Sequence, residues 1–213
     1  MVSTDHSREM RKWEHEVSEI ENWREFLTAW EEEAKLIVSL IPESVVEEQE
    51  RAERFPTRLM RDAAAPEDVR GSIGKLGRPL PLDMREFYLA SNGWYQLGFD
   101  EYDLEILSAT NLYRLAEAES RVVSAVMSYA NDGSIVGVGS EIYKTSDADS
   151  LVVLSDASPS GLYLAVIDDR ASADTCPCYV LRYQSAPRKF GSFGALMKFE
   201  RDRCLNSLRS LLD

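Results

Sequence analysis

This 213-residue chain has few of the side chains that most often carry catalysis. The only histidines are His6 and His15, and both lie in the charged N-terminal stretch. A general base, a nucleophile or a metal site needs several suitable side chains brought together. We therefore expect no histidine triad and no histidine-rich metal site. We interpret the chain as a non-enzymatic protein with no catalytic residues, cofactor or metal.

Cysteine is also scarce. Cys176, Cys178 and Cys204 are an odd number, and two of them are one residue apart, which is not typical of a disulfide framework. A single Cys-x-Cys without a second pair is a weak indication of a metal or redox site. We interpret Cys176 and Cys178 as ordinary loop and strand residues, and we place Cys204 in the core.

No apolar run approaches the roughly 20 residues that a membrane-spanning helix needs. The N-terminal sequence MVSTDHSREMRKWEHE also lacks the apolar segment of a signal peptide. We therefore expect a soluble cytoplasmic protein that does not act at a membrane.

Basic residues are outnumbered, since 24 Lys and Arg stand against 37 Asp and Glu, for a net charge of −13. Binding to nucleic acid needs a basic surface that neutralises phosphates, so nucleic acid is not an expected partner. The glycine-rich segments lack the strand, loop and Gly-Lys-Ser/Thr context of a phosphate-binding site. The charge instead favours a basic protein partner, attracted over a long range.

A long amphipathic segment occupies residues 8–40. Apolar side chains recur at steps of three and four with no Gly or Pro before Pro42, which predicts one helix of about 30 residues. This apolar side, with three tryptophans, either packs on the same chain or forms a dimer or partner interface. Its apolar residues are Trp13, Val17, Ile20, Trp23, Leu27, Trp30, Ala34, Ile37 and Ile41.

A weaker helical pattern, containing Pro56, follows at residues 43–62. The best candidate for a domain boundary is the alanine run that precedes Pro66. Pro66 followed by Glu67 and Asp68 is typical of a helix start. We therefore divide the chain into a long helical extension, residues 1–65, and an α+β domain, residues 66–213.

The clearest local signal is the stretch from Leu76 to Trp94, LGRPLPLDMREFYLASNGW. Asp83 followed by Glu86 predicts a capping box at the start of a short helix. The pair Asn92-Gly93 is typical of the point where a helix ends in a left-handed residue. The expected buried face of this helix consists of Met84, Phe87, Tyr88 and Ser91.

The remaining pattern predicts strands, one further helix and a C-terminal helix. Short runs rich in β-branched and aromatic residues, separated by turn-sized gaps, favour a central, mostly antiparallel sheet. The segments expected to be strands are 94–97, 104–107, 134–138, 151–154, 162–167 and 179–183. The segments expected to be helices are 111–130 and 192–212, the second capped by Ser192. The apolar residues on or near one face of the second helix are Phe193, Leu196, Met197, Cys204, Leu205 and Leu208.

The order of these segments resembles the SUKH superfamily, which includes cell-wall-assembly regulators and bacterial toxin-immunity proteins. The resemblance covers roughly two thirds of the chain, from Pro66 to Asp213. It implies an α+β fold with a central sheet flanked by helices and a non-enzymatic role in binding a protein. The matching residues are Leu76-Gly77, Leu80-Pro81, Arg85-Glu86-Phe87, Asn92-Gly93, Trp94, Tyr179 and Phe190-Gly191-Ser192-Phe193.

Aromatic and acidic residues alternate directly after the Asn-Gly pair, and we interpret them as a candidate partner-binding surface. Trp94 has a second interpretation as a core residue, and the carboxylates have a second one as a solvated loop. The candidate residues are Trp94, Tyr95, Asp100, Glu101, Tyr102, Asp103 and Glu105.

Two functions remain open at this point. The first is an immunity protein that binds and neutralises a cognate bacterial toxin, the partner being a basic toxin domain. The second is a housekeeping regulatory or scaffold protein that forms a homodimer through its N-terminal tryptophan-rich helix.

Overall fold

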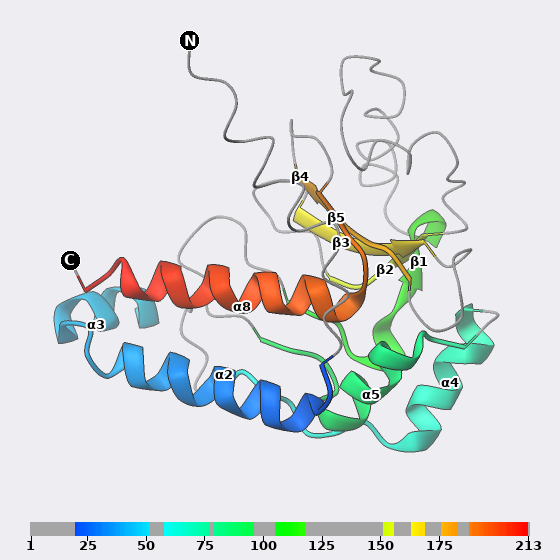
Figure 1. Cartoon of the computed structure of the whole chain (residues 1–213), viewed down its shortest axis with the longest axis horizontal. Helices are drawn as coiled ribbons and strands as arrows, with labels where there is room; N and C mark the ends of the chain where they lie inside the picture. Colours follow the sequence, from blue (N-terminus) through cyan, green and yellow to red (C-terminus); the bar gives the residue numbers. More distant parts are fainter. Residues whose placement is uncertain are drawn as a thin grey trace, which may run out of the picture.

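The computed structural model describes residues 20–51, 58–76, 79–95, 105–117, 151–155, 163–168, 176–182 and 188–212. These residues form a mixed α+β fold, as predicted, in which helices flank a small sheet (Figure 1). The helices are α2 (Trp23–Val38), α3 (Glu43–Arg51), α4 (Pro66–Leu76), α5 (Leu82–Ala90) and α8 (Phe193–Arg209), and the 3-10 turns are η1 (Ala109–Asn111) and η2 (Leu115–Glu117).

The sheet is an antiparallel meander in the order β1-β2-β3-β4-β5. Its strands are β1 (Tyr113–Arg114), β2 (Leu151–Val153), β3 (Tyr163–Asp168), β4 (Cys178–Arg182) and β5 (Arg188–Phe190). Val153 lies opposite Val166, which in turn lies opposite Tyr179, so one register line crosses the three central strands. These three strands confirm the segments predicted at 151–154, 162–167 and 179–183. The sequence pattern misses β5, because its three residues, Arg-Lys-Phe, are too few to show alternation.

A row of single-residue bridges continues the pairing beyond β2. Ser155 pairs with Ile106, Ile106 with Trp94, and Trp94 with Met60, each in the antiparallel sense. The segments around Trp94 and Ile106, which the sequence predicts to be strands, therefore form, within the described residues, only these isolated bridges and no continuous strands. Through them the end of the Leu76–Trp94 stretch is joined to the sheet.

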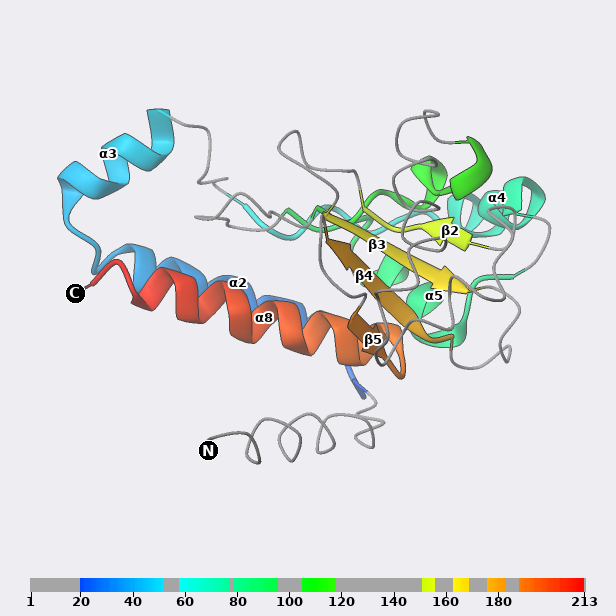
Figure 2. The same ribbon diagram turned by 90° about the horizontal axis from the view of Figure 1, so that it is seen from above.

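Helices α2 and α8 lie side by side and run in the same direction, with the sheet beside their N-terminal ends (Figures 1 and 2). The Glu33 carboxylate of α2 accepts hydrogen bonds from Arg201 and Arg209 of α8, both at 2.6 Å. Ion pairs of this kind, partly open to solvent, contribute little to stability. The main contact between the helices is apolar.

Three aromatic rings join α2, α5 and α8. The ring centroid of Trp23 lies 5.3 Å from that of Phe87 and 5.5 Å from that of Phe193. The Phe87 and Phe193 centroids are 5.0 Å apart, and all three side chains are buried. Rings at these separations stabilise a core beyond the burial of their area.

The apolar side of α2 faces this core, with Trp23, Leu27, Trp30, Ala34 and Ile37 all buried. Of the two interpretations of the N-terminal helix, packing on the same chain therefore describes α2. Buried residues on both sides of Pro66 belong to one hydrophobic cluster. Within the described residues, the predicted boundary at Pro66 does not separate two cores.

The prediction of one continuous helix over residues 8–40 is wrong at Asn22. This residue is extended, with φ −138° and ψ 98°, and its side chain accepts a hydrogen bond from the Glu25 N–H at 3.1 Å. An asparagine in this position satisfies a free N–H group of the first turn, so α2 begins at Trp23. Residues 8–19, with Trp13, lie outside the described residues.

Two other helices differ from their predicted spans. α3 ends by Arg51, and residues 58–65 are not helical, with Met60 in a bridge to Trp94; residues 52–57 lie outside the described part. The helix predicted at 111–130 is wrong over 111–117, where η1, β1 and η2 follow one another. Residues 118–130 and the strand predicted at 134–138 are not among the described residues.

Asp83 is not the N-cap residue of its helix, because α5 begins at Leu82 after Pro81, which makes no side-chain cap. One oxygen of the Asp83 carboxylate accepts a hydrogen bond from the Met84 N–H of α5 at 2.8 Å. The other oxygen accepts from the N–H groups of Phe193 and Gly194, at 3.1 and 3.3 Å. These are free N–H groups at the start of α8, where a negative charge is favourable. The expected Asp83 cap is thus a contact between two helices.

At the same end of α8, Ser192 caps the helix as predicted, accepting from the Ala195 N–H at 3.1 Å. The predicted buried face of α8 is confirmed, with Phe193, Leu196, Met197, Cys204, Leu205 and Leu208 all buried. Burial raises the pKa of the Asp83 carboxyl, and this outweighs the hydrogen bonds that lower it.

We expect Trp30→Ala to lower the free energy of unfolding by about 3–5 kcal/mol, because it leaves a cavity in the core. Leu36→Ala, on the same helix but at a side chain 63% exposed, is the control and should change it by less than about 0.5 kcal/mol. Urea denaturation followed by circular dichroism measures both. Equal losses in the two variants would contradict the placement of α2.

Candidate functional site

Three side chains from separate parts of the chain meet at the surface and form what we call the Arg61 cluster: Arg61, Tyr95 and Glu105. The Arg61 guanidinium carbon lies 3.8 Å from the centroid of the Tyr95 ring. The same guanidinium donates through Nη2 to the Glu105 carboxylate. One arginine thus contacts an aromatic face and a carboxylate at once.

Backbone hydrogen bonds hold the residues of this cluster in place. The Arg61 N–H donates to Ser91 Oγ, and the Tyr95 N–H donates to the Leu59 carbonyl, both at 2.9 Å. Glu105 directly precedes Ile106, which exchanges two backbone hydrogen bonds with Trp94 at 3.0 and 3.1 Å. The side chains therefore project from a fixed backbone.

Gly93 makes room for this arrangement. Its φ is +104°, and a Cβ atom built there would lie 2.6 Å from the Ile106 carbonyl oxygen and 3.2 Å from Arg61 Cδ. Only glycine tolerates this backbone conformation together with such a close approach. The prediction that the Asn-Gly pair ends the helix is wrong, because α5 ends at Ala90 and is followed by an extended Ser91. Gly93 instead lets Arg61 reach Tyr95 and Glu105.

The exposed part of the cluster is aromatic and acidic. Tyr95 is 40% exposed and the Glu105 side chain 46%, whereas the Arg61 side chain is only 20% exposed. A partner would therefore meet mainly a ring and a carboxylate, with the arginine beneath them.

The predicted surface residues are distributed unevenly. Tyr95 and Glu105 are in the cluster, whereas Trp94 is buried in the core, with its ring centroid 4.6 Å from that of Trp30. Trp94 thus follows its second interpretation and does not face a partner. Asp100, Glu101, Tyr102 and Asp103 lie outside the described residues.

Sequence reasoning missed Arg61. Its partner Glu105 is 44 residues further along the chain, and residues 43–62 read as a weak helix. The one local signal was Asn92-Gly93, because a left-handed glycine often marks a close approach of two chain segments. That signal does not say which segment approaches.

Glu31 of α2 anchors the segment that carries Arg61. Its carboxylate accepts hydrogen bonds from the N–H groups of Leu59 and Met60, at 3.0 and 2.7 Å, and pairs with Lys35 at 2.5 Å. Burial by itself raises the pKa of Glu31, but Lys35 and the two N–H groups outweigh it. The pKa of Glu31 therefore lies below its ordinary value, and the carboxylate stays charged.

Tyr88 lies fully buried on the inner side of α5. Burial raises the pKa of its phenol strongly, and the charge of Arg61 offsets only part of this effect. Among the described residues the hydroxyl has no hydrogen-bond partner, and the raised pKa keeps it neutral. Tyr88 therefore supplies neither a general acid nor a general base to the Arg61 cluster.

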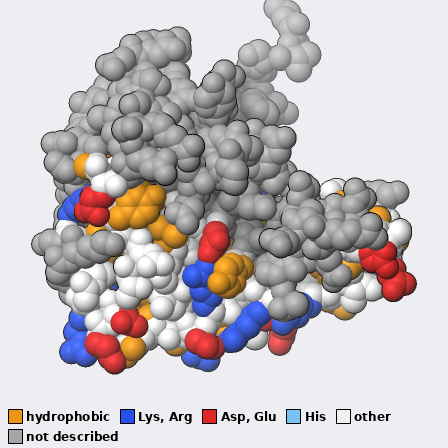
Figure 3. All heavy atoms as spheres, turned by 180° about the vertical axis from the view of Figure 1, so that it is seen from behind, with side chains coloured by type: hydrophobic (Ala, Val, Ile, Leu, Met, Phe, Trp, Pro, Cys, Tyr) orange, Lys and Arg blue, Asp and Glu red, His pale blue; other side chains and the backbone are white. Residues whose placement is uncertain are grey.

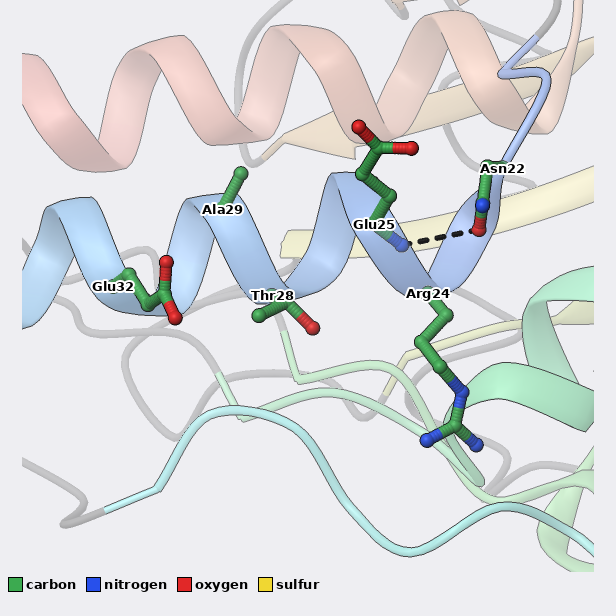
Figure 4. A pocket seen from close by; sticks show the side chains of 6 residues that line it. All are labelled: Asn22, Arg24, Glu25, Thr28, Ala29 and Glu32. Carbon is green, nitrogen blue, oxygen red and sulfur yellow. Dashed lines mark hydrogen bonds between the residues drawn. The ribbon is translucent and has the colours of Figure 1, made fainter.

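Shallow hollows surround the N-terminal half of α2, and none gathers groups for catalysis. One is lined by Asn22, Arg24, Glu25, Thr28, Ala29 and Glu32. The side chains of Arg24, Glu25 and Glu32 point in different directions from the helix (Figure 4). A reaction needs side chains that converge on one point, so we assign no active site to this hollow.

Among the residues that the structure describes, no three His, Cys, Asp or Glu side chains are placed to hold a metal ion. Cys176, Cys178 and Cys204 are buried and form no disulfide within the described part of the chain. Burial raises the pKa of the Cys178 thiol, which makes it a poor nucleophile and a poor metal ligand.

Comparison with models of known protein families, with curated proteins and with solved structures found no match. No helix of the described part of the chain is long and apolar enough to cross a membrane.

We expect Glu31→Gln to lower the free energy of unfolding by roughly 1–2 kcal/mol at neutral pH, because it removes the negative charge that accepts hydrogen bonds from the Leu59 and Met60 N–H groups. Since the folded-state pKa of Glu31 is lowered, its contribution is lost as pH falls through that value. The free energies of unfolding of the native and variant proteins should therefore become equal at acid pH. Urea denaturation across pH measures this, with the exposed neighbour Glu32→Gln as control. A constant difference down to low pH would contradict the role of the charge.

Proposed function

We propose that the protein is a non-enzymatic protein-binding module, and specifically an immunity protein that binds and neutralises a cognate bacterial toxin in the cytoplasm. The observation that carries the proposal is the Arg61 cluster, where an exposed tyrosine and a carboxylate are held on a fixed backbone. Tyrosine and arginine are the residues that most often dominate protein interfaces, especially when their geometry is set before binding.

The net charge of −13 supports a basic toxin domain as the partner. On the face drawn in Figure 3, acidic and basic side chains of the described residues are interspersed. The long-range attraction of a basic partner therefore comes from the net charge of the whole chain. The choice of one partner over another depends on local contacts. Asp100, Glu101 and Asp103, which lie between Tyr95 and Glu105 in the sequence, extend the proposed contact surface.

Co-expression with the protein encoded by the adjacent gene tests the proposal. We expect rescue of growth and co-elution of the two proteins, and weaker binding by the variant D100N/E101Q/D103N. The control E21Q/E32Q/D202N removes the same charge from exposed positions of the helical side. Titration calorimetry measures both affinities.

We expect at least a tenfold larger dissociation constant for the first variant than for the control, since charges at the contact act more strongly than distant ones. Equal affinities in the two variants would remove the acidic segment from the contact. Absence of any binding or rescue would overturn the immunity assignment.

One observation favours the second candidate, a regulatory or scaffold protein that oligomerises through its N-terminal helix. Trp23 and Trp30 are buried in the core, but Leu36 near the end of α2 and Leu40 in the turn just after it are 63% and 64% exposed. Two exposed leucines close together in the chain suit contact with a second copy.

Light scattering of the full chain and of L36E/L40E distinguishes this candidate. The scaffold requires twice the chain mass of 24.1 kDa, returning to one chain mass in the variant. From the proposed immunity function we expect one chain mass in both, since its contact lies on the Arg61 cluster. A dimer that survives L36E/L40E would exclude these leucines as its interface.

A further inference from the structure

We infer that Tyr95 and Glu105 form a receptor for one arginine or lysine side chain of the partner, with Arg61 as the positioning residue that holds both. The inference rests on the proposed function, and it names the chemistry by which the partner is recognised. It also gives each residue of the Arg61 cluster a separate role.

The exposed groups define the chemistry. An aromatic face attracts a cation, and a carboxylate accepts charge-assisted hydrogen bonds from one. Tyr95 and Glu105 provide these two groups side by side, because both contact the same guanidinium. Within the described residues, Glu105 accepts no other hydrogen bond, so part of its carboxylate is free for a partner.

Arg61 covers one face of the Tyr95 ring and pairs with Glu105, yet these two residues stay 40% and 46% exposed. The Arg61 side chain is only 20% exposed, its Nε atom is buried with no hydrogen-bond partner among the described residues, and its Cδ lies against Gly93. Arg61 therefore approaches Tyr95 and Glu105 from inside, and leaves their outer sides to solvent. Because its guanidinium pairs with Glu105, Arg61 also holds that carboxylate in place.

This arrangement lowers the cost of binding. Immobilising a long side chain on association costs about 0.5–1.5 kcal/mol. Glu105 and Tyr95 are already held by Arg61, which is itself fixed by the hydrogen bond from its backbone N–H to Ser91 Oγ. Most of the ordering therefore falls on the incoming basic side chain.

The probes are hexa-arginine and hexa-glutamate peptides, titrated into the full chain and followed by the backbone amide NMR signals of Gly93, Tyr95 and Ile106. Hexa-arginine should shift these signals and hexa-glutamate should not. Glu105→Gln should weaken hexa-arginine binding about fivefold or more, and Tyr95→Ala by a similar factor. The matched control is Glu67→Gln, an exposed carboxylate on α4. Equal weakening by E105Q and E67Q would overturn the receptor, since only total charge would then matter.

The charge swap R61E/E105R tests whether Arg61 positions the receptor residues or only stabilises the fold through the ion pair. It preserves the ion pair and the net charge, but places the cation outside and the anion inside. We expect a melting temperature close to that of the native chain, loss of the hexa-arginine shifts and new shifts with hexa-glutamate. Retained hexa-arginine binding in a folded swap variant would overturn the inference. If the swap variant does not fold, the effect of Glu105→Gln on hexa-arginine binding alone decides whether the receptor exists.

The two proposals can fail separately. A toxin that binds the native chain and E105Q equally well overturns the receptor and leaves the immunity function in place. Peptide binding that depends on Glu105 and Tyr95, without any binding of the adjacent-gene product, supports the receptor and overturns the toxin assignment.

Discussion

The contact of Trp23 with Phe87 and Phe193 is the one on which the rest of the fold depends. It joins α2, α5 and α8, three helices that are far apart in the sequence. Once these rings are packed, the N-terminus of α8 lies next to α5, and its free N–H groups meet the Asp83 carboxylate. A polar contact that would be weak in water is thereby placed where burial strengthens it.

The same helix determines where the Arg61 cluster lies. Trp30 packs on Trp94, while Glu31, the next residue of α2, holds the N–H groups of Leu59 and Met60. Two adjacent residues of one buried helix thus fix both segments that carry the cluster. Met60 and Trp94 directly precede Arg61 and Tyr95 in the chain, so these contacts fix the backbone beneath the surface that the two residues form.

Local patterns in the sequence predict much of the fold. The apolar side of α2, the buried face of α8, its Ser192 cap and the antiparallel strands follow from periodicity and turn residues. Other features depend on partners that no local pattern identifies. The Asp83 carboxylate accepts hydrogen bonds from N–H groups 110 and 111 residues further along the chain, and Arg61 donates to a glutamate 44 residues away. The sequence places Tyr95 and Glu105 in one surface, but not the arginine that joins them.

The distance in sequence between α2 and α8 has a consequence for synthesis. Phe193 is made 170 residues after Trp23. At about 5–20 residues per second, the interval is on the order of ten seconds or more. During this interval the apolar side of α2 lacks the side chains of α8 that cover it in the folded protein. The core therefore closes only after α8 has left the ribosome, and a chain that terminates before α8 is a substrate for chaperones and proteases.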